Sequence, residues 1–186
     1  MEQTSRREIA FISGPLETGP DASYFREHYT KRIDAAIARG DDFVIGPIPY
    51  GVDKDALDYL LAYPISPSRI TIFVTPDEDR MWGNNFRFRG VRVNVLKHDP
   101  ERGTPGPRDR DAAMTANSTY DILRWRTRIE AKKFYGKAWR DGHLTNTERN
   151  WRRRRGIGEE VIIREEDVDF FMEDNEAQKK ERCVAC

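Results

Sequence analysis

Short apolar runs alternate with amphipathic stretches along most of this chain. Each run is rich in Val, Ile or Phe and is followed by glycine, proline or polar turn residues, which is the pattern of a buried strand. Between the runs, residues 24–38 and 54–63 place apolar side chains at helical spacing, and Gly40 and Pro64 end these two stretches. The predicted strands cover residues 8–13, 42–46, 69–75, 91–96 and 120–125.

Strands that alternate with helices of this length form βαβ units, which require a parallel sheet with right-handed crossovers. We therefore predict an α/β fold, with a Rossmann-like parallel sheet of about five strands flanked by helices. Thr127-x-x-Glu130 and Thr145-x-x-Glu148 have the form of capping boxes, so each predicts the start of a further helix.

Two segments are predicted to be loops. Residues 101–110 are rich in Gly, Pro, Asp and Arg and lead into a short helix at 111–118. Residues 80–89 mix arginine and asparagine with three aromatic residues. Two interpretations of this mixture stay open: it stacks a base and pairs with a phosphate, or it is a solvated loop anchored by its aromatic side chains.

Charge divides the 186-residue chain into two parts. Residues 1–155 carry a formal net charge of +6 and residues 156–186 one of −6. We predict a single nucleotide-binding domain at 1–155, followed by an acidic C-terminal appendage at 156–186 with a mobile end. A predicted strand at 161–163 and the apolar residues 170–172 give the appendage apolar side chains to bury.

No apolar run approaches the roughly 20 residues that span a bilayer, and the N-terminus is polar, unlike a secretory signal. We expect a cytoplasmic protein, with the nucleus as an alternative suggested by the basic run 149–155. The last four residues match the prenylation pattern, so membrane attachment is expected only if Cys183 is lipidated. The three histidines show no metal-ligand spacing, and we expect neither a metal nor a cofactor.

Ligands of open parallel sheets bind at the carboxyl ends of the strands, and three turns of this chain fall there. The turn at 13–15 and the turn at 46–53 contain glycines that would let a phosphate or sugar approach the backbone. Asp53 would either accept hydrogen bonds from ribose hydroxyls or only cap a helix. Glu130 would either act at an anomeric carbon or only complete its capping box.

The second turn resembles a known signature. Gly46-x4-Gly51-x-Asp53, followed by residues 56–60, resembles the glycine-rich motif of the SLOG superfamily, and residues 108–114 with Ser118, Tyr120 and Trp125 are similar to a further run of small SLOG proteins. Residues 13–15 and Thr127-x-x-Glu130 resemble the related nucleoside 2-deoxyribosyltransferases. The likeness covers about residues 8–140.

This resemblance implies a catalytic Glu130, acting as nucleophile or base. It implies a ligand site formed by Ser13, Gly14, Pro15, Gly46, Pro47, Gly51, Val52, Asp53, Arg108, Tyr120 and Thr127. The chain departs from both families at Arg126, where they favour a glycine before the threonine. The arginine either obstructs a phosphate or supplies a guanidinium in place of backbone contacts.

We therefore predict binding of a nucleotide, nucleoside or nucleotide-derived ligand, with cleavage or transfer at its N-glycosidic bond if the protein is an enzyme. The alternative is a non-catalytic sensor or interaction module that uses the basic helix and the acidic tail. A homodimer is compatible with either. Nucleic acid is a less favoured partner, because the basic run can pair with the acidic segment that follows it.

Overall fold

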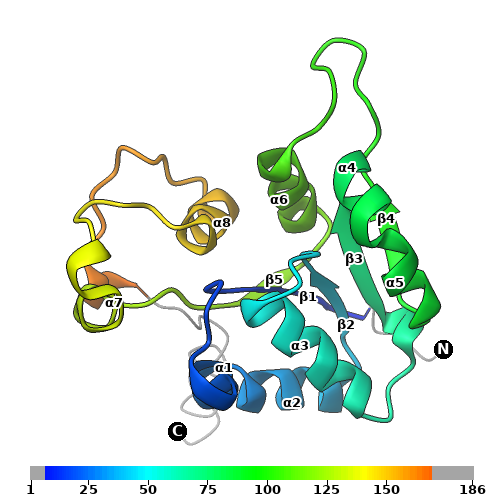
Figure 1. Ribbon diagram of the computed structural model, residues 1–186, viewed down its shortest axis with the longest axis horizontal. Helices are drawn as coiled ribbons and strands as arrows, with labels where there is room; N and C mark the ends of the chain where they lie inside the picture. Colours follow the sequence, from blue (N-terminus) through cyan, green and yellow to red (C-terminus); the bar gives the residue numbers. More distant parts are fainter. Residues whose placement is uncertain (1–6, 169–186) are drawn as a thin grey trace, which may run out of the picture.

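The computed structural model describes residues 7–168 and confirms the α/β class (Figure 1). All five strands are parallel and lie in the order β4-β3-β2-β1-β5. They are β1 (Ile9–Ser13), β2 (Asp42–Ile45), β3 (Ile70–Val74), β4 (Arg92–Val95) and β5 (Tyr120–Leu123).

Eight α-helical segments connect and follow these strands in the described residues. They are α1 (Ser23–His28), α2 (Thr30–Arg39), α3 (Gly51–Ala62), α4 (Pro76–Glu78), α5 (Asn84–Phe88), α6 (Pro107–Ala116), α7 (Arg128–Tyr135) and α8 (Asn146–Arg155). The helix predicted at 24–38 is divided between α1 and α2 at Tyr29.

Three local predictions were wrong. Most of residues 80–89 is helical: α4 and α5 are joined by a π-helical turn, Asp79–Gly83, and Thr75 and Glu78 form a capping box at the start. Helix α6 begins at Pro107 rather than at 111, because the Gly106 amide donates to the Asp109 carboxylate and proline favours the first helical position. Residues 161–163 form no strand.

The two faces of the sheet bury alternate residues of each strand, as the period of a strand requires. On one face the larger core packs α1, α2, α3 and α5 against strand residues that include Ala10, Ile12, Phe43, Ile45, Ile70 and Ile72. On the other face Phe11, Val44 and Phe73 pack against Met114 of α6. Figure 1 shows α6 and α8 on the side of the sheet opposite α2 and α3.

The described part of the acidic segment packs on the domain. Ile157, Ile163 and Val168 contact the cluster of Leu123, Trp125 and Trp151. Arg152 of α8 donates to the carbonyls of Gly158 and Val161, both at 2.8 Å. The apolar residues 170–172 and the two cysteines lie outside the described residues. No helix within residues 7–168 has the length and apolar character needed to cross a bilayer.

Candidate functional site

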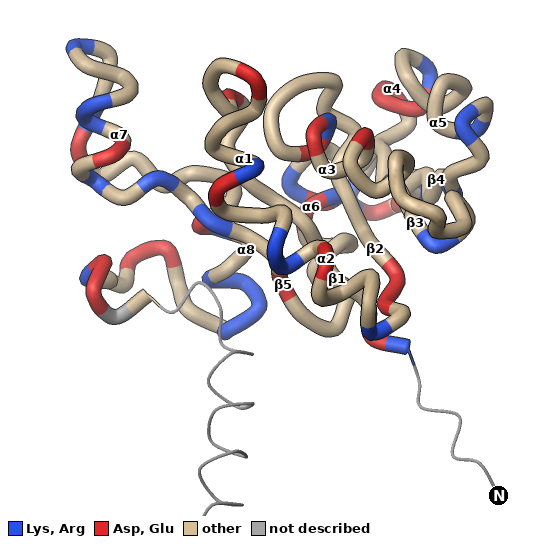
Figure 2. Tube along the Cα trace, turned by 90° about the horizontal axis from the view of Figure 1, so that it is seen from below, with Lys and Arg blue, Asp and Glu red and all other residues tan. Residues whose placement is uncertain are grey.

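The strand order of the sheet reverses at β1, so that β5 lies on the opposite side of β1 from β2. From β1 the chain adds β2, β3 and β4 on one side, and it then returns through α6 to place β5 on the other side of β1. The carboxyl ends of the two strands on either side of such a reversal, here β1 and β5, are the usual ligand position in open α/β sheets. Here residues 13–15 and 124–127 border it, and Figure 2 shows α3, α4 and α7 on this same side of the molecule.

Tyr29 bridges the ends of β1 and β5 at this switch point. Its hydroxyl lies 3.0 Å from the Ser13 carbonyl, lies 2.9 Å from the Arg124 carbonyl and accepts from the Arg124 amide at 3.1 Å. Only 1% of the Tyr29 residue surface is exposed, and this burial raises the pKa of its hydroxyl well above the ordinary value. A Cβ at Gly14 would overlap the Tyr29 hydroxyl and the Val52 side chain, so glycine is required there for packing.

Four side chains beside Tyr29 form what we call the switch-point cluster: Tyr24, Arg124, Arg126 and Glu130. Arg124 donates to both carboxylate oxygens of Glu130, at 3.0 and 2.8 Å, and to the Tyr24 hydroxyl at 2.7 Å. The Glu130 carboxylate also accepts from the Thr127 amide at 2.8 Å, which completes the predicted capping box.

These contacts determine the protonation state of Glu130. Partial burial acts to raise the pKa of its carboxyl, but the hydrogen bonds from Arg124 and Thr127 outweigh burial and lower the pKa below the ordinary value. Glu130 is therefore an ionised carboxylate whose two oxygens are both engaged. This geometry matches its structural interpretation, and its catalytic role stays a prediction.

Arg126 lies deeper in the same cluster. Only 9% of the residue is exposed, and its guanidinium carbon lies 3.9 Å from the ring centroid of Phe134 and 4.6 Å from that of Tyr24. Its Nη2 donates to the Glu17 carbonyl at 2.6 Å, whereas its buried Nη1 has no hydrogen-bond partner within residues 7–168. The arginine that replaces the expected glycine is thus enclosed by aromatic rings.

A second group, the helix-start cluster, lies where α3, α4 and α6 begin: Asp53, Glu78, Arg110 and Asp111. Arg110 is buried and pairs with Glu78 and with Asp111, the latter at 2.9 Å. Burial raises the pKa of Asp53 to about 7; Arg110 opposes this rise, and Asp111 and Glu78 add to it. Asp53 can therefore exchange a proton near neutral pH.

The glycine turns do not leave the open backbone that the sequence suggested. A Cβ at Gly46 would overlap the Asp53 carboxylate, and one at Gly51 would lie 2.6 Å from the Leu16 backbone. The Val52 side chain is buried, and its amide donates to the Pro15 carbonyl at 3.1 Å. The turns at 13–15 and 46–53, including the buried Pro47, therefore pack on each other, and protein atoms fill the space beside Gly14, Gly46 and Gly51 where a side chain would lie. Binding of a phosphate or sugar at these turns stays a prediction.

Two predicted ligand residues lie apart from these clusters. Arg108 is exposed in the first turn of α6, and it is Arg110 that turns inward. Tyr120 is the first residue of β5, so it lies at the amino edge of the parallel sheet, where its hydroxyl donates to Asp41 at 2.7 Å. The structure thus corrects the prediction that Tyr120 joins the carboxyl-edge site.

The basic run of α8 makes contacts within the chain. Arg152 is buried and donates to Glu148 at 2.7 Å, and Arg154 pairs with Asp121 of β5 at 2.8 Å. The guanidinium of Arg155 lies over the Trp151 ring, with 4.2 Å between its carbon and the ring centroid. The Arg154–Asp121 pair thus holds α8 against β5, whereas the contacts of Arg152 with Glu148 and of Arg155 with Trp151 lie within α8 itself.

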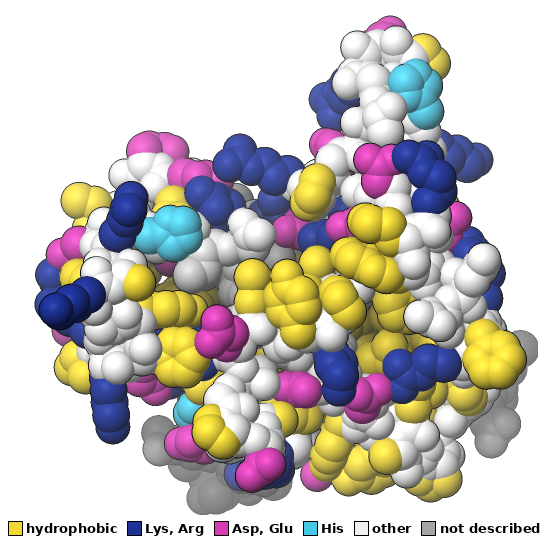
Figure 3. Space-filling model, in the orientation of Figure 1, with side chains coloured by type: hydrophobic (Ala, Val, Ile, Leu, Met, Phe, Trp, Pro, Cys, Tyr) yellow, Lys and Arg dark blue, Asp and Glu magenta, His cyan; other side chains and the backbone are white. Residues whose placement is uncertain are grey.

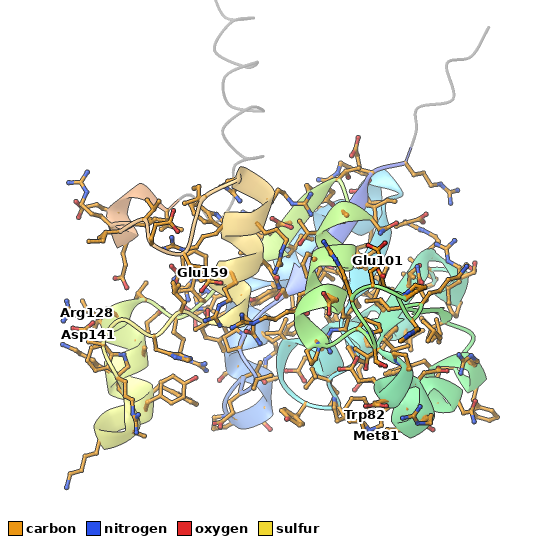
Figure 4. All side chains as sticks on the ribbon, turned by 90° about the horizontal axis from the view of Figure 1, so that it is seen from above. Met81, Trp82, Glu101, Arg128, Asp141 and Glu159 are labelled. Carbon is orange, nitrogen blue, oxygen red and sulfur yellow. The ribbon has the colours of Figure 1, made fainter. Side chains whose placement is uncertain are left out.

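The face that carries the carboxyl ends also exposes apolar side chains. Leu16, Tyr50 and Met81, which follow β1, β2 and β3, are each more than half exposed. Figure 3 shows hydrophobic side chains gathered over the loop before α3 and beside α4, and Figure 4 shows Met81 next to Trp82 at this end of the molecule. Such a surface suits a flat apolar group.

Two hollows of the described surface lie away from the switch-point and helix-start clusters. One of about 430 Å³ lies between α1 and α3 and is lined by residues including Phe25, Asp55 and Tyr59. The other, of about 460 Å³, lies on the sheet face beside α6. Neither is lined by the two clusters, and no group of three or more His, Cys, Asp or Glu in residues 7–168 is arranged to hold a metal ion.

Sequence reasoning missed Tyr24, Tyr29 and Arg124, and it favoured Arg108 over Arg110. A signal existed for Arg124, because Arg-Trp-Arg directly follows a predicted strand and cations at a strand's carboxyl end can meet a ligand. Comparison with models of known families, with curated proteins and with solved structures finds no match to this chain.

Proposed function

We propose that this chain binds a nucleotide, nucleoside or nucleotide-derived ligand across the carboxyl edge of its sheet. The observation that carries the proposal is the position of Arg124 and Arg126 at the switch point between β1 and β5. Two guanidinium groups at this position suit an anionic ligand, because their planar forks match phosphate and carboxylate oxygens.

The remaining features of the edge match the other parts of such a ligand. The Asp53 carboxyl, with a pKa of about 7, would donate to or accept from sugar hydroxyls. The exposed Tyr50 side chain, with Leu16 and Met81, would contact a flat base. The proposal therefore assigns binding to side chains and not to the filled glycine turns.

Cleavage at an N-glycosidic bond is the second candidate. Glu130 would be the ionised carboxylate and Asp53 the protonated acid, since opposite pKa shifts are how active sites divide acid and base roles. A ligand anion that binds Arg124 would weaken the Arg124–Glu130 pair and release the carboxylate. Binding without turnover is the simpler proposal, because both Glu130 oxygens are already engaged.

The experiment is a thermal-shift and calorimetric screen of the full chain against nucleosides, nucleoside mono- and diphosphates, NAD and ADP-ribose. A ligand at about 100 times its Kd adds roughly 2.7 kcal/mol of stability. Asp53→Asn should weaken a hit at least tenfold. Asp58→Asn, on the same helix but paired with Lys54 and Arg89, is the matched control and should not.

Chromatography of each hit separates the two candidates. Release of free base that disappears in Glu130→Gln would support the enzyme, and binding without release would support a sensor. If no compound stabilises the protein, the nucleotide proposal is wrong. The interaction module would then be tested by nucleic-acid binding at increasing salt.

A further inference from the structure

Arg126 is a buried cation with no counter-ion among the described residues. It forms no ion pair with any carboxylate of residues 7–168, and its side-chain hydrogen bond goes to the neutral Glu17 carbonyl. A charge removed from water is ordinarily paired, because its desolvation is otherwise costly. The site therefore holds a positive charge that the described chain does not neutralise.

The other charged groups of the switch-point cluster, Arg124 and Glu130, do not neutralise the charge of Arg126. Arg124 is the nearest other cation of the cluster, and the Glu130 carboxylate is bidentate to it. One glutamate thus faces two arginines, which leaves a net charge of about +1 in the switch-point cluster if all three are ionised. A single monoanionic group would make the cluster neutral.

The aromatic rings explain how the cation is tolerated and oriented. Phe134 and Tyr24 lie close enough for cation–π contacts, and Tyr135 lies 5.9 Å away. Ring faces stabilise a guanidinium but accept no hydrogen bond along its edge, so the Nη1 donor stays unsatisfied. Nη1 is therefore the donor that an oxyanion would accept from, and the ligand would have to open the surrounding ring enclosure to reach it.

We infer that Arg126, assisted by Arg124, is the anion subsite of the proposed ligand site and binds a phosphate group. This inference rests on the proposed function and names the part of the ligand that the switch point recognises. The terminal phosphate of a nucleotide and free inorganic phosphate share this chemistry. The loop that carries Glu17 and Leu16 borders the subsite and links it to the exposed apolar surface.

The test compares matched ligands by calorimetry on the full chain: adenosine with AMP, guanosine with GMP, and inorganic phosphate alone. In the wild type we expect at least one monophosphate to bind tenfold or more tightly than its nucleoside. Arg126→Gln should abolish that difference and leave nucleoside affinity within about threefold. Arg126→Lys keeps the charge without the planar fork and should retain part of the difference.

Arg128→Gln is the matched control. Arg128 is two residues away, is exposed, and pairs with Asp141 on the outer side of α7, as Figure 4 shows. This variant should bind both members of each pair as the wild type does. Melting temperatures without ligand should agree within a few degrees among all variants. If Arg126→Gln does not fold, Arg126→Lys is compared with the wild type in its place.

The outcomes distinguish this inference from the proposed function. If nucleosides and nucleotides bind but Arg126→Gln weakens both equally, or neither, the anion subsite is wrong and the ligand site stands. If inorganic phosphate binds and depends on Arg126 but no nucleoside or nucleotide binds, the subsite stands and the nucleotide proposal fails. If none of the probes binds the wild type, both are wrong.

Discussion

Arg124 and Glu130 hold each other through two hydrogen bonds across the turn that follows the last strand. The guanidinium donates at 3.0 and 2.8 Å, and the same carboxylate caps α7 through the Thr127 amide. One glutamate therefore fixes both the start of a helix and the direction of an arginine at the switch point. Structure and proposed function depend on the same pair.

The Arg124–Glu130 pair predicts a pH dependence of stability. A carboxyl whose pKa is lowered by folding stabilises the fold above its unfolded pKa, ordinarily about 4.5, and this contribution is lost as pH falls through the folded value. Urea unfolding at pH 7 and below pH 4 should show wild type more stable than Glu130→Gln at the higher pH, with the gap shrinking in acid. A gap independent of pH would contradict the lowered pKa.

Asp53 predicts a pH dependence of stability of the opposite sign. Its pKa is raised from 3.8 to about 7 by burial, so the folded state binds more protons than the unfolded state between these values. Stability should fall as pH rises from about 4 to 7, by up to about 4 kcal/mol from this group, since each pKa unit corresponds to about 1.4 kcal/mol. Asp53→Asn should remove that fall, whereas Asp58→Asn should keep it.

Gly14→Ala should destabilise the fold. The new methyl group would overlap the Tyr29 hydroxyl and the Val52 side chain, and overpacking of this kind costs about 1–3 kcal/mol. Gly106→Ala is the control, since a Cβ there would lie 3.9 Å from a carboxylate oxygen of Asp109, an ordinary van der Waals contact. In a double-mutant cycle, Tyr29→Phe should reduce the cost of Gly14→Ala, and strict additivity would argue against the contact.

Arg154→Gln should also destabilise the fold, by about 1–3 kcal/mol, because within residues 7–168 it leaves the buried Asp121 carboxylate paired with only the more distant Arg155. Arg140→Gln, an exposed arginine in the preceding loop, is the control and should be neutral. Combining Arg154→Gln with Asp121→Asn should cost less than the sum of the two. If Arg154→Gln instead leaves stability unchanged and abolishes nucleic-acid binding, the basic run is a partner surface.

Local pattern was sufficient for the strands and for several helix starts. The five apolar runs became the five strands; β1, β2 and β3 are buried on both faces, whereas β4 alternates between partly buried valines and exposed polar residues. The Thr127 capping box is confirmed; at Thr145 only the hydroxyl caps, because Glu148 pairs with Arg152 instead. The overlooked α4 begins with the same signal, Thr75-Pro76-x-Glu78, so it was predictable from sequence.

The sequence by itself thus determined the α/β class and most element positions, since hydrophobic period and caps act within a few residues. Only the tertiary structure decided that β5 lies beside β1, that Arg110 rather than Arg108 turns inward, and that protein atoms fill the glycine turns. These outcomes depend on which distant elements become neighbours. Which group pairs with a buried charge is decided only when those elements pack. Arg126, which has no such partner among residues 7–168, is the example here.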